Sequence, residues 1–492
     1  SNMRDWMISK KRYWGLALPI WVSDDGSRFE VIGSREELER RAVEGWEEFD
    51  GHTPHRPWID AVKIAGPDGS VLTRVPDVGN PWLDAGIVPY STTKYNTDRD
   101  YWERWVPADL VLESFPGQFR NWFYSLLAMS TMMEGIPPFK ALVGHAQVRD
   151  EHGEEMHKSK GNAIWFDDAV DRVGSDVLRW LFLSHDIRNN LNFSFDDASS
   201  IRGRVFATLW NSHAFFVNYA RTVAFDPDRE APPVSRRTVL DRWILAELAT
   251  VVSDSREAFE RYDIRAAVRG IEAFVDSLSN WYIRHSRRRF WRGEGRDESA
   301  AFHTLYECLE TVCRLIAPIV PMLAEAMYRN LTAASESAPE SVHLAEYPLI
   351  DEATSGADEL SEQMQVVIDT TTAALRARKQ AGIRIRQPLS RLAVGLSTAA
   401  EVGAVEMMSG LITGEVNVKE LDLRPPTEKR PTIRVGELDL RRVGPKFGPK
   451  TTALVQAFNA NADRVVGEIE RGAGSAVLTV EGEPLTLSAE DL

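Results

Sequence analysis

The spacing of apolar residues changes near Ile201, and this change limits what the chain can fold into more than any other feature. From there on, apolar residues recur every three or four positions in segments that start at Leu240 and Ile264 and in a third segment at 302–316. Such spacing predicts amphipathic helices. Because helices joined by short connections must cover one another's apolar faces, residues 201–388 are predicted to form a helical bundle.

The first 200 residues show a mixed pattern. A short strand is predicted at 16–21, a buried helix at 121–133 and a second strand at 141–143. Another helix is predicted at 174–185, with Ser175 as its N-cap. A strand, a helix and a strand in this order indicate part of a parallel α/β sheet.

Short strand patterns return after Pro388. They are predicted at 392–394, 417–421, 432–435 and 476–480. We interpret residues 389–492 as a small α+β module. The predicted fold class is therefore multidomain, α/β followed by all-α and then this module, and 492 residues accommodate about three or four domains.

The composition, with 43% hydrophobic and 27% charged residues, is typical of a globular protein and excludes a mainly disordered chain. A net charge of -15 argues against an unspecific coat on nucleic acid but leaves room for a local basic face. No apolar run approaches the roughly 18 residues of a membrane helix, so we expect a cytoplasmic protein. Cys308 and Cys313 suit neither a zinc site nor a disulfide framework by their spacing, and no metal site is predicted.

The most informative segment is the loop at 153–162, which carries Lys158 and Lys160. It follows a predicted strand and a polar turn and precedes the helical region. A lysine on such a loop can follow the negative charge that develops on a polyphosphate during displacement, so the loop is a candidate for electrostatic catalysis. Taken alone, a solvated surface loop is the more ordinary interpretation, because runs of charge are usually exposed.

In its context this loop resembles the signature loop of the class I aminoacyl-tRNA synthetases, usually Lys-Met-Ser-Lys-Ser, at Glu155–Ser159. Other segments are similar to the isoleucyl-tRNA synthetases within that class, and they follow in that family's order. They are Asp5–Ser9, Arg12–Gly15, His55–Asp60, Val75–Val78, Trp82–Gly86, Asn121–Ser125, Leu240–Ile244 and Asn280–Arg284. The resemblance runs to about residue 390 and therefore covers most of the chain.

Two departures from the family pattern stand out. The family's first signature, His-x-Gly-His, and its editing domain are absent, so we expect a C-terminal portion: an expressed fragment, one part of a split enzyme or a truncated homologue. Within the loop, Glu155 replaces the first Lys and His157 the first Ser, whereas Lys158 is retained. A carboxylate at position 155 would repel a triphosphate unless it points away from it.

The resemblance implies a division into four parts. Residues 1–150 would form the second half of a Rossmann-like nucleotide-binding catalytic domain, 151–200 the signature loop and a stem-contact region, 201–388 a helical anticodon-binding domain and 389–492 the C-terminal α+β module. The implied activity of the intact enzyme is ATP-dependent attachment of isoleucine to its tRNA through isoleucyl-adenylate, with Mg2+ accompanying ATP. The chain alone is expected to be inactive.

The resemblance also implies residues of the active site. Lys158 and Ser159 would act in catalysis. Binding of ATP and of the adenylate would involve Glu113, Gln118, Trp122, Gly144, His145, Met156, His157 and Lys158. Glu113 suits the adenylate's amino group through a charge-assisted hydrogen bond, and Gly144, at a strand end, would let adenosine approach the backbone. The alternatives are a Glu113 that leads a helix, a Trp122 that only fills the core and a structural His145.

Two basic stretches are candidates for RNA binding. The first comprises Arg284, Arg287, Arg288, Arg289, Trp291 and Arg292, and the second contains Arg376, Arg378 and Lys379. Arginines can pair with phosphates while planar groups stack on unpaired bases, so these stretches are expected to contact tRNA. For the first stretch, the alternative is a network of arginines paired with acidic side chains inside the bundle.

A second hypothesis belongs to a different class of protein. A non-catalytic RNA-binding or regulatory paralogue would also lack the first signature and would tolerate changes in the loop. Specificity for valine or leucine is a weaker rival, since part of the pocket that measures the amino-acid side chain would lie outside this chain. We expect a monomer that binds isoleucine tRNA, with the N-terminal catalytic half as a partner if the enzyme is split.

Overall fold

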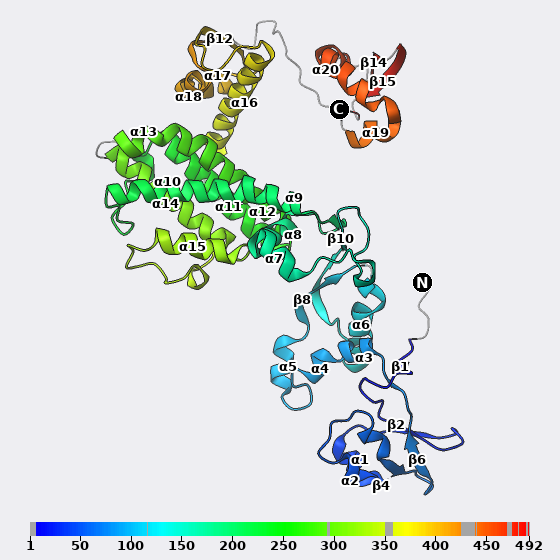
Figure 1. Cartoon of the computed structure of the whole chain (residues 1–492). Coiled ribbons are helices and arrows are strands. Elements are labelled where there is room, and N and C mark those ends of the chain that lie inside the picture. Colours follow the sequence, from blue (N-terminus) through cyan, green and yellow to red (C-terminus); the bar gives the residue numbers. More distant parts are fainter. Residues whose placement is uncertain are drawn as a thin grey trace. The chain divides into compact units, whose positions relative to one another are not determined.

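The computed structural model describes residues 6–115, 117–292, 296–349, 358–424, 438, 440–469, 475–480, 482–488 and 491. The chain divides into two compact units, Ser1–Glu352 and Ala353–Leu492, whose helices and strands are labelled in Figure 1. Within the described residues, no helix combines the length and the apolar character that crossing a bilayer requires.

Five short strands form an antiparallel sheet near the start of the first unit. Their order across the sheet is β3 (Phe29–Val31), β2 (Ile20–Val22), β6 (Val71–Arg74), β5 (Lys63–Ala65) and β4 (Ala42–Glu44). The short helices α1 (Arg35–Arg41) and α2 (Trp46–Phe49) and a 3-10 turn at Trp58–Ala61 complete this part. Its core is built around the fully buried Trp21, whose indole Nε1 donates to the carbonyl of Val62 at 2.7 Å.

The prediction that the first strand belongs to a parallel sheet is wrong. The strand lies at Ile20–Val22 and pairs antiparallel with both β3 and β6. Short connections explain the arrangement, because the turn between β5 and β6 holds Gly69 at φ +80°, a left-handed conformation that lets the chain reverse within a few residues.

A short connecting region leads from this sheet to the next element. Strand β1 (Ser9–Lys10) pairs with β7 (Val78–Gly79), and helices α3 (Pro81–Gly86), α4 (Val88–Ser91) and α5 (Arg99–Trp105) follow. The Asn80 side chain accepts from the backbone N–H of Trp82 at 3.0 Å, and Pro81 follows it at the first helical position. This is the favoured start of a helix.

The parallel α/β element predicted from the sequence exists, but its first strand is a different one. Strand β8 (Ala108–Ser114) pairs parallel with β9 (Phe139–His145), and helix α6 (Trp122–Met133), preceded by a 3-10 turn at Gly117–Arg120, connects them. Val111 packs with Phe123 and Leu126 beneath the helix. Polar residues such as Asp109 interrupt the apolar run of β8, which hides this strand from a search for buried strands.

The chain then forms a second parallel pair before turning helical. Strand β10 (Val148–Arg149) pairs with β11 (Leu191–Asn192), and between them lie a 3-10 turn at Lys158–Lys160 and helices α7 (Phe166–Val173) and α8 (Ser175–Ser184). The N-cap predicted at Ser175 is wrong by one residue. Gly174 occupies that position at φ +89°, and Ser175 is the first helical residue.

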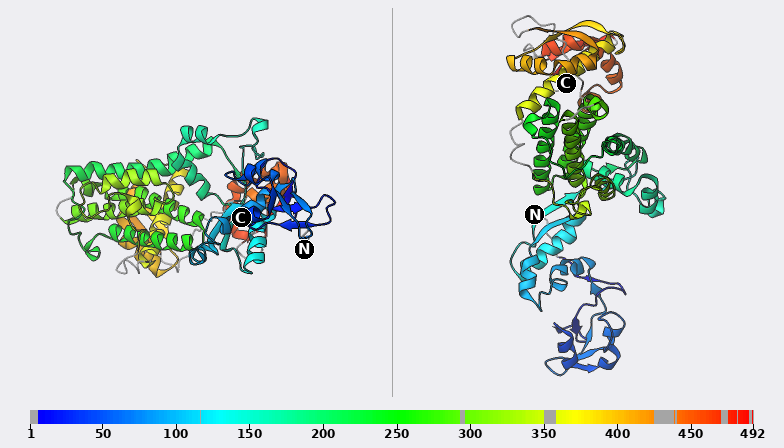
Figure 2. Two further views of the ribbon diagram at one scale, coloured as in Figure 1. Left: turned by 90° about the horizontal axis from the view of Figure 1, so that it is seen from below. Right: turned by 90° about the vertical axis from the view of Figure 1, so that its left-hand side faces the viewer.

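A helical bundle is present as predicted, but of the predicted range 201–388 the residues from Ala353 on belong to the second unit. The bundle contains α9 (Phe195–Ile201), α10 (Ala207–Thr222), α11 (Val239–Glu260), α12 (Ile264–Asp276), α13 (Arg284–Arg292), α14 (Arg296–Ile316) and α15 (Pro321–Leu331), with π-helical turns at Arg202–Phe206 and Ser277–Ile283. The views in Figures 1 and 2 agree that these helices, drawn in green, lie side by side. The Asp263 side chain caps α12 by accepting from the N–H of Ala266 at 3.2 Å.

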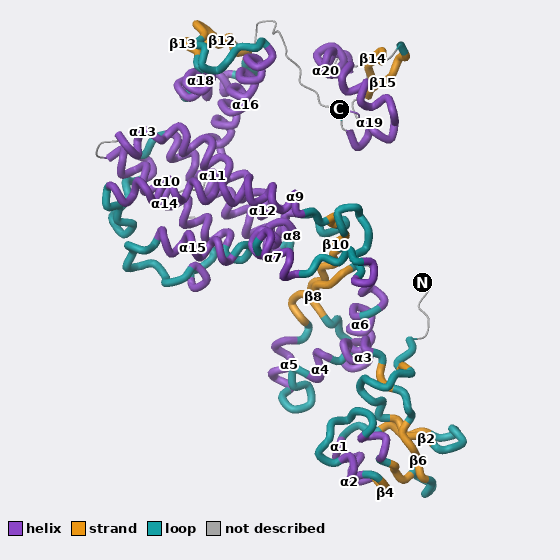
Figure 3. The backbone as a smooth tube through the Cα atoms, in the orientation of Figure 1, coloured by secondary structure: helices purple, strands orange, loops and turns teal. Residues whose placement is uncertain are grey.

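The second unit mixes helices and strands. It begins with α16 (Asp358–Gln380), and then β12 (Leu389–Gly395), α17 (Ala399–Met407), α18 (Ser409–Val416) and β13 (Val418–Arg424) form a parallel pair with two helices between its strands. Helices α19 (Leu440–Phe447) and α20 (Thr451–Glu468) precede the antiparallel strands β14 (Ser475–Val480) and β15 (Glu483–Ser488) (Figure 3). The strand predicted at 432–435 lies outside the described residues.

Candidate functional site

The lysine loop runs from Asp150, directly after β10, to Asn162, shortly before α7. The Asp150 carboxylate accepts from the backbone N–H groups of Glu154 at 2.8 Å and His152 at 3.1 Å. The Asn162 side chain donates to that carboxylate at 2.8 Å. These bonds, that of Asn162 first, hold the pKa of Asp150 below its usual value. The two ends of the loop are therefore joined through side chains.

The charged side chains within the loop contact one another. The Glu155 carboxylate lies 3.5 Å from His157 Nε2, and Lys160 Nζ lies 3.7 Å from Glu154. Lys158 Nζ sits 4.5 Å from the centre of the Trp165 ring. Lys158 and Ser159 are exposed and Met156 is half-buried. The loop therefore presents the predicted catalytic lysine to solvent while Glu155 and His157 face each other.

The carboxyl ends of β8 and β9 bring three predicted residues together. Glu113 lies opposite Gly144 in the strand register, and Ser114 opposite His145. Because Glu113 is part of β8, the alternative that it leads a helix is wrong. One carboxylate oxygen accepts from the N–H of Ser114 at 2.8 Å, and the side chain is only half-buried.

Two other predicted residues serve the local fold. Gln118 accepts from the backbone N–H of Trp122 at 3.1 Å and so takes over the cap of α6. The Trp122 indole donates to the carbonyl of Ala85 at 3.1 Å, which ties α6 to α3. For Trp122, the structural alternative is thus supported by a specific contact.

Gly144 and His145 are closely packed against their neighbours. A Cβ atom on Gly144 would lie 3.0 Å from Cβ of Phe115, so a larger residue would displace that phenyl ring. His145 Nδ1 lies 2.8 Å from the carbonyl oxygen of Ala146. Phe115 is 46% and Phe119 63% exposed, and their rings meet edge to face with centroids 5.6 Å apart. Sequence reasoning missed this aromatic pair beside the strand ends.

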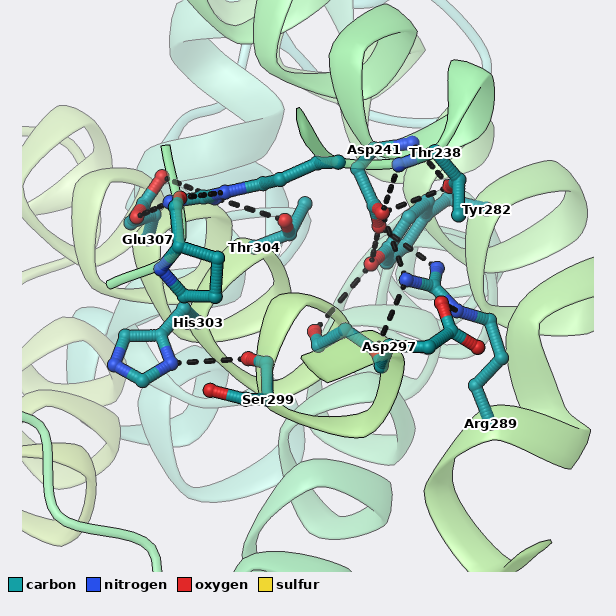
Figure 4. A network of polar contacts seen from close by, with 12 residues as sticks. Thr238, Asp241, Tyr282, Arg289, Asp297, Ser299, His303, Thr304 and Glu307 are labelled. Carbon is teal, nitrogen blue, oxygen red and sulfur yellow. Dashed lines mark hydrogen bonds and ion pairs between the residues drawn. The ribbon is translucent and has the colours of Figure 1, made fainter. Parts of the chain in front are cut away.

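The arginines of α13 divide into two groups. Arg284, Arg287 and Arg288 are exposed, and Trp291 is 49% exposed. Arg289 instead makes a two-pronged ion pair with Asp241 at 2.8 and 2.7 Å, and its Nε donates to Asp297 at 2.9 Å (Figure 4). The side chain of Arg292 lies outside the described residues. The buried-network alternative therefore holds for Arg289.

Asp241 is the centre of that network and is fully buried. Asp241 also accepts from the hydroxyls of Tyr282 and Thr238, each at 2.7 Å. Thr238 in turn accepts from the backbone N–H of Asp241, so the two residues form a capping box at the start of α11. Burial opposes ionisation of the carboxyl, but the hydrogen bonds and charge of Arg289 outweigh it, so the pKa of Asp241 lies below its usual value. Burial raises the pKa of Tyr282.

The basic stretch at the end of α16 has the same division. Arg376 and Lys379 are exposed, whereas Arg378 is only 4% exposed. Arg378 Nη2 donates to the carbonyls of Arg384 at 2.7 Å, Ile385 at 3.3 Å and Gln387. The turn at 384–387 is thus tied to the helix, and a hollow of about 510 Å³ lined by these cations lies beside it.

Two family models match separate parts of the chain. Residues 1–194 match the family model "tRNA synthetases class I (I, L, M and V)", and residues 241–393 match "Anticodon-binding domain of tRNA ligase". These two parts are therefore similar to tRNA synthetases. The multidomain fold class predicted from the sequence is confirmed by these matches.

The curated relatives are more specific. An isoleucine–tRNA ligase of Porphyromonas gingivalis is 35% identical over 518 residues, and one of Thermus thermophilus is 37% identical over 499 residues. Each match covers 100% of this chain but only 45% and 47% of the relative. The chain therefore spans a little under half the length of these proteins and is homologous to isoleucine–tRNA ligases along its whole extent.

A solved structure shares the fold. The chain matches LeuRS in a LeuRS–tRNA–LeuAMS ternary complex from Agrobacterium radiobacter with a TM-score of 0.55 and 19% identity, over 72% of this chain and 43% of that chain. This likeness shows a common architecture.

Proposed function

We propose that the chain is the C-terminal part of an isoleucyl-tRNA synthetase, which attaches isoleucine to its tRNA at the expense of ATP. The observation that carries the proposal is homology to isoleucine–tRNA ligases over the whole chain, with a catalytic-region match followed by an anticodon-binding match. The four-part division given by the sequence, a cytoplasmic location and a monomeric state belong to the same proposal.

In the intact enzyme, a carboxylate oxygen of isoleucine would attack the α-phosphate of ATP. A new P–O bond forms, the bond to the β-phosphate breaks, and pyrophosphate leaves with the negative charge that this produces. Lys158, exposed on its loop, would neutralise that charge, assisted by the Ser159 hydroxyl. A tRNA hydroxyl oxygen would then form an ester bond to the acyl carbon of the adenylate, the bond from that carbon to the phosphate oxygen would break, and AMP would leave. No strong base is required, since positioning and charge carry the step.

The strand ends supply the remaining contacts in this proposal. Glu113 would pair with the ammonium group of isoleucyl-adenylate, and Gly144 and His145 would lie beside the adenosine. Met156 and His157, which directly precede Lys158 in the loop, would also contact ATP. Gln118 and Trp122 act through the position of α6, to judge from their contacts with the fold.

We propose that Mg2+ arrives with the phosphates of ATP. Among the described residues, no group of three or more His, Cys, Asp or Glu side chains could hold a metal ion.

For tRNA binding, we propose the exposed members of the two basic stretches. Arg284, Arg287, Arg288 and Trp291 would meet RNA from α13, and Arg376 and Lys379 from the end of α16. RNA contacts were also predicted for Arg289 and Arg378. In this proposal they have a structural role instead, because Arg289 ties α13 to Asp241 and Arg378 ties α16 to the turn that follows it. Arg292 remains a proposed contact.

The decisive experiment is isoleucine-dependent pyrophosphate exchange. The chain alone should be inactive, because the first signature is absent. Exchange should appear when the N-terminal half of an isoleucyl-tRNA synthetase is supplied, for example that of the Thermus thermophilus relative. Exchange with valine or leucine but not isoleucine would overturn the proposed specificity.

The second candidate function is a non-catalytic RNA-binding paralogue. The contact between Glu155 and His157 favours it, since both residues replace family residues in the signature loop. Persistent tRNA binding without any exchange in the complemented mixture would support this function over the first.

A further inference from the structure

One side chain holds three separate parts of the lysine loop. Asn162 Nδ2 donates to Asp150 Oδ2 at 2.8 Å and to the carbonyl of Glu155 at 3.2 Å, while Asn162 Oδ1 accepts from the N–H of His157 at 2.9 Å. Both amide donors and the amide acceptor are thus used within the loop. The side chain is half-buried, so these bonds are partly shielded from water.

The other end of the loop is anchored to the sheet. Asp150 directly follows β10, whose Val148 and Arg149 pair with β11. Its carboxylate accepts from the N–H groups of Glu154 and His152, and its backbone N–H donates to the carbonyl of Glu154 at 3.0 Å. The first part of the loop is therefore fixed to β10, and Asn162 fixes the second part to Asp150.

Lys158 lies between His157, whose backbone N–H Asn162 holds, and Asn162 itself. The backbone at 155 and 157 is bonded to Asn162, and the turn closes through Gly161, whose N–H donates to the carbonyl of Lys158 at 3.2 Å. Within the described part of the chain, Lys158 Nζ forms no ion pair and rests over the exposed ring of Trp165. The backbone around the lysine is constrained, while its ammonium group stays available.

We propose that Asn162 is a positioning residue of the signature loop. By joining Asp150 to the backbone at 155 and 157, it fixes the path of the loop and so the place at which Lys158 presents its charge. The inference rests on the function proposed above for Lys158. Asn162 itself does not have to touch ATP or isoleucine.

The chain allows an almost isosteric test. Asn162→Asp keeps the acceptor for His157 but removes both amide donors and places a second carboxylate against Asp150. The double variant Asp150→Asn with Asn162→Asp exchanges the two side chains, preserves the net charge and lets the amide at 150 donate to the carboxylate at 162. Asn190→Ala is the matched control, because Asn190 accepts from the N–H of Gln147 at 3.1 Å near β10 but does not reach the loop.

The rate of trypsin cleavage after Lys158 and Lys160 in the folded chain measures how often the loop opens. This measurement does not require an active enzyme. Cleavage of a native loop follows the population of its open form. We expect Asn162→Asp to speed cleavage by about tenfold, as the loss of a hydrogen bond to a charged group predicts. The exchanged pair should recover part of this increase, because the contact between positions 150 and 162 returns while the bond to the Glu155 carbonyl does not, and Asn190→Ala should leave the rate unchanged.

Cleavage of Asn162→Asp at the parent rate, or an exchanged pair as sensitive as the single variant, would overturn the proposal. Circular dichroism at 222 nm and a thermal midpoint equal to the parent's would confirm that only the loop has changed.

The second measurement is pyrophosphate exchange after complementation with the N-terminal half. Asn162→Asp should lower kcat by about tenfold with little change in KM for isoleucine, and the exchanged pair should recover part of this loss. An unchanged kcat in a variant with a trypsin-sensitive loop would overturn the positioning role. Absence of exchange in the parent mixture would count against the proposed function alone, since the trypsin comparison still decides whether Asn162 fixes the loop.

Discussion

Two polar networks in the first unit centre on an aspartate, and they differ in their access to water. Asp241 is fully buried between α11, the π-helical turn at Ser277–Ile283 and α13, where it holds Arg289, Tyr282 and Thr238. Asp150, itself half-buried, lies on the mostly exposed lysine loop and binds Asn162 and backbone N–H groups.

We therefore expect changes in the Asp241 network to affect mainly stability and changes in the Asp150 network to affect mainly the lysine loop. Asp241 is a buried charge with no water to replace a lost partner, so removing a partner from its network should destabilise the fold. In a partly exposed network water can replace a lost partner, so the loss of one bond should loosen the loop without unfolding the chain. In the proposed enzyme, the bundle would act as a rigid support, and the loop would be the part that responds to substrate.

The largest expected effect comes from breaking the buried network. Asp241→Ala leaves the Arg289 guanidinium and the Tyr282 hydroxyl without their partner, so the free energy of unfolding should fall by about 3–5 kcal/mol. Urea denaturation of the chain followed by circular dichroism measures it. A loss below about 1 kcal/mol would show that water reaches Arg289 and that the network is not dry.

The pH dependence of the free energy of unfolding gives a second test of the buried network. Because the pKa of Asp241 is lowered in the folded state, its contribution is fully present above the unfolded-state pKa of about 3.9 and is lost as pH falls through the lower folded value. The stability difference between the parent and Asp241→Asn should be constant from neutral pH to about 4 and should shrink below that. A difference that shrinks near neutral pH would contradict this assignment.

Changing Lys158 should lower catalysis and leave stability unchanged, whereas changing Asp241 should lower stability. In the complemented enzyme, Lys158→Ala should lower kcat for pyrophosphate exchange by roughly 10²-fold, with little effect on KM for isoleucine, because the contact is made mainly in the transition state. The exposed position predicts an unchanged unfolding midpoint. Lys140→Ala, an exposed lysine paired with Asp109 on β8, is the control for loss of charge.

An intermediate effect is expected at Arg378. Arg378→Ala frees the carbonyls of Arg384, Ile385 and Gln387, so the second unit should lose about 1–3 kcal/mol. Arg376→Ala, two residues earlier and exposed, should leave stability within about 0.5 kcal/mol. Equal losses in the two variants would contradict the structural role of Arg378.

A smaller effect is expected at the surface of α13. Replacing Arg287 and Arg288 together by Ala should weaken binding of isoleucine tRNA and reduce the slope of log K against log salt by about 1.5. Stability should be unchanged, in contrast to Asp241→Ala. The double variant has a matched control in Arg40→Ala, an exposed arginine on α1. An unaltered salt slope would remove α13 from the proposed RNA interface.

These contrasts also show what the sequence could and could not predict. Helical spacing after Ile201 predicted the bundle, because amphipathic helices repeat a strong local signal. Strand β8 was not predicted, because its polar residues break the apolar run. Strand β2 was assigned to the wrong sheet, because its pairing partners include β6, which lies far from it in the sequence.

The division among the arginines could not be predicted for a similar reason. Arg288 and Arg289 are neighbours in sequence, yet one is exposed and the other is paired with Asp241, 48 positions earlier. Only the folded bundle, which brings α13 within reach of Asp241 on α11, decides between them. The loop residue Asn162 had a local signal, since Asn beside Gly favours turns, but its partner Asp150 lies 12 positions away.

The smallest effect is expected at Glu155, where the loop departs from the family. In the structure its carboxylate faces His157 at 3.5 Å, and both side chains are about half exposed, so the pair contributes little to stability. Glu155→Lys removes this contact and a negative charge beside the path of a triphosphate. Pyrophosphate exchange in the complemented enzyme should therefore hold or rise by up to about threefold, since a screened surface charge is worth less than 1 kcal/mol. His157→Ser, which restores the other family residue, is the companion variant. If Glu155→Lys abolished exchange while Lys158→Ala did not, the lysine that meets ATP would have been assigned to the wrong position, and the loop would work through a different register.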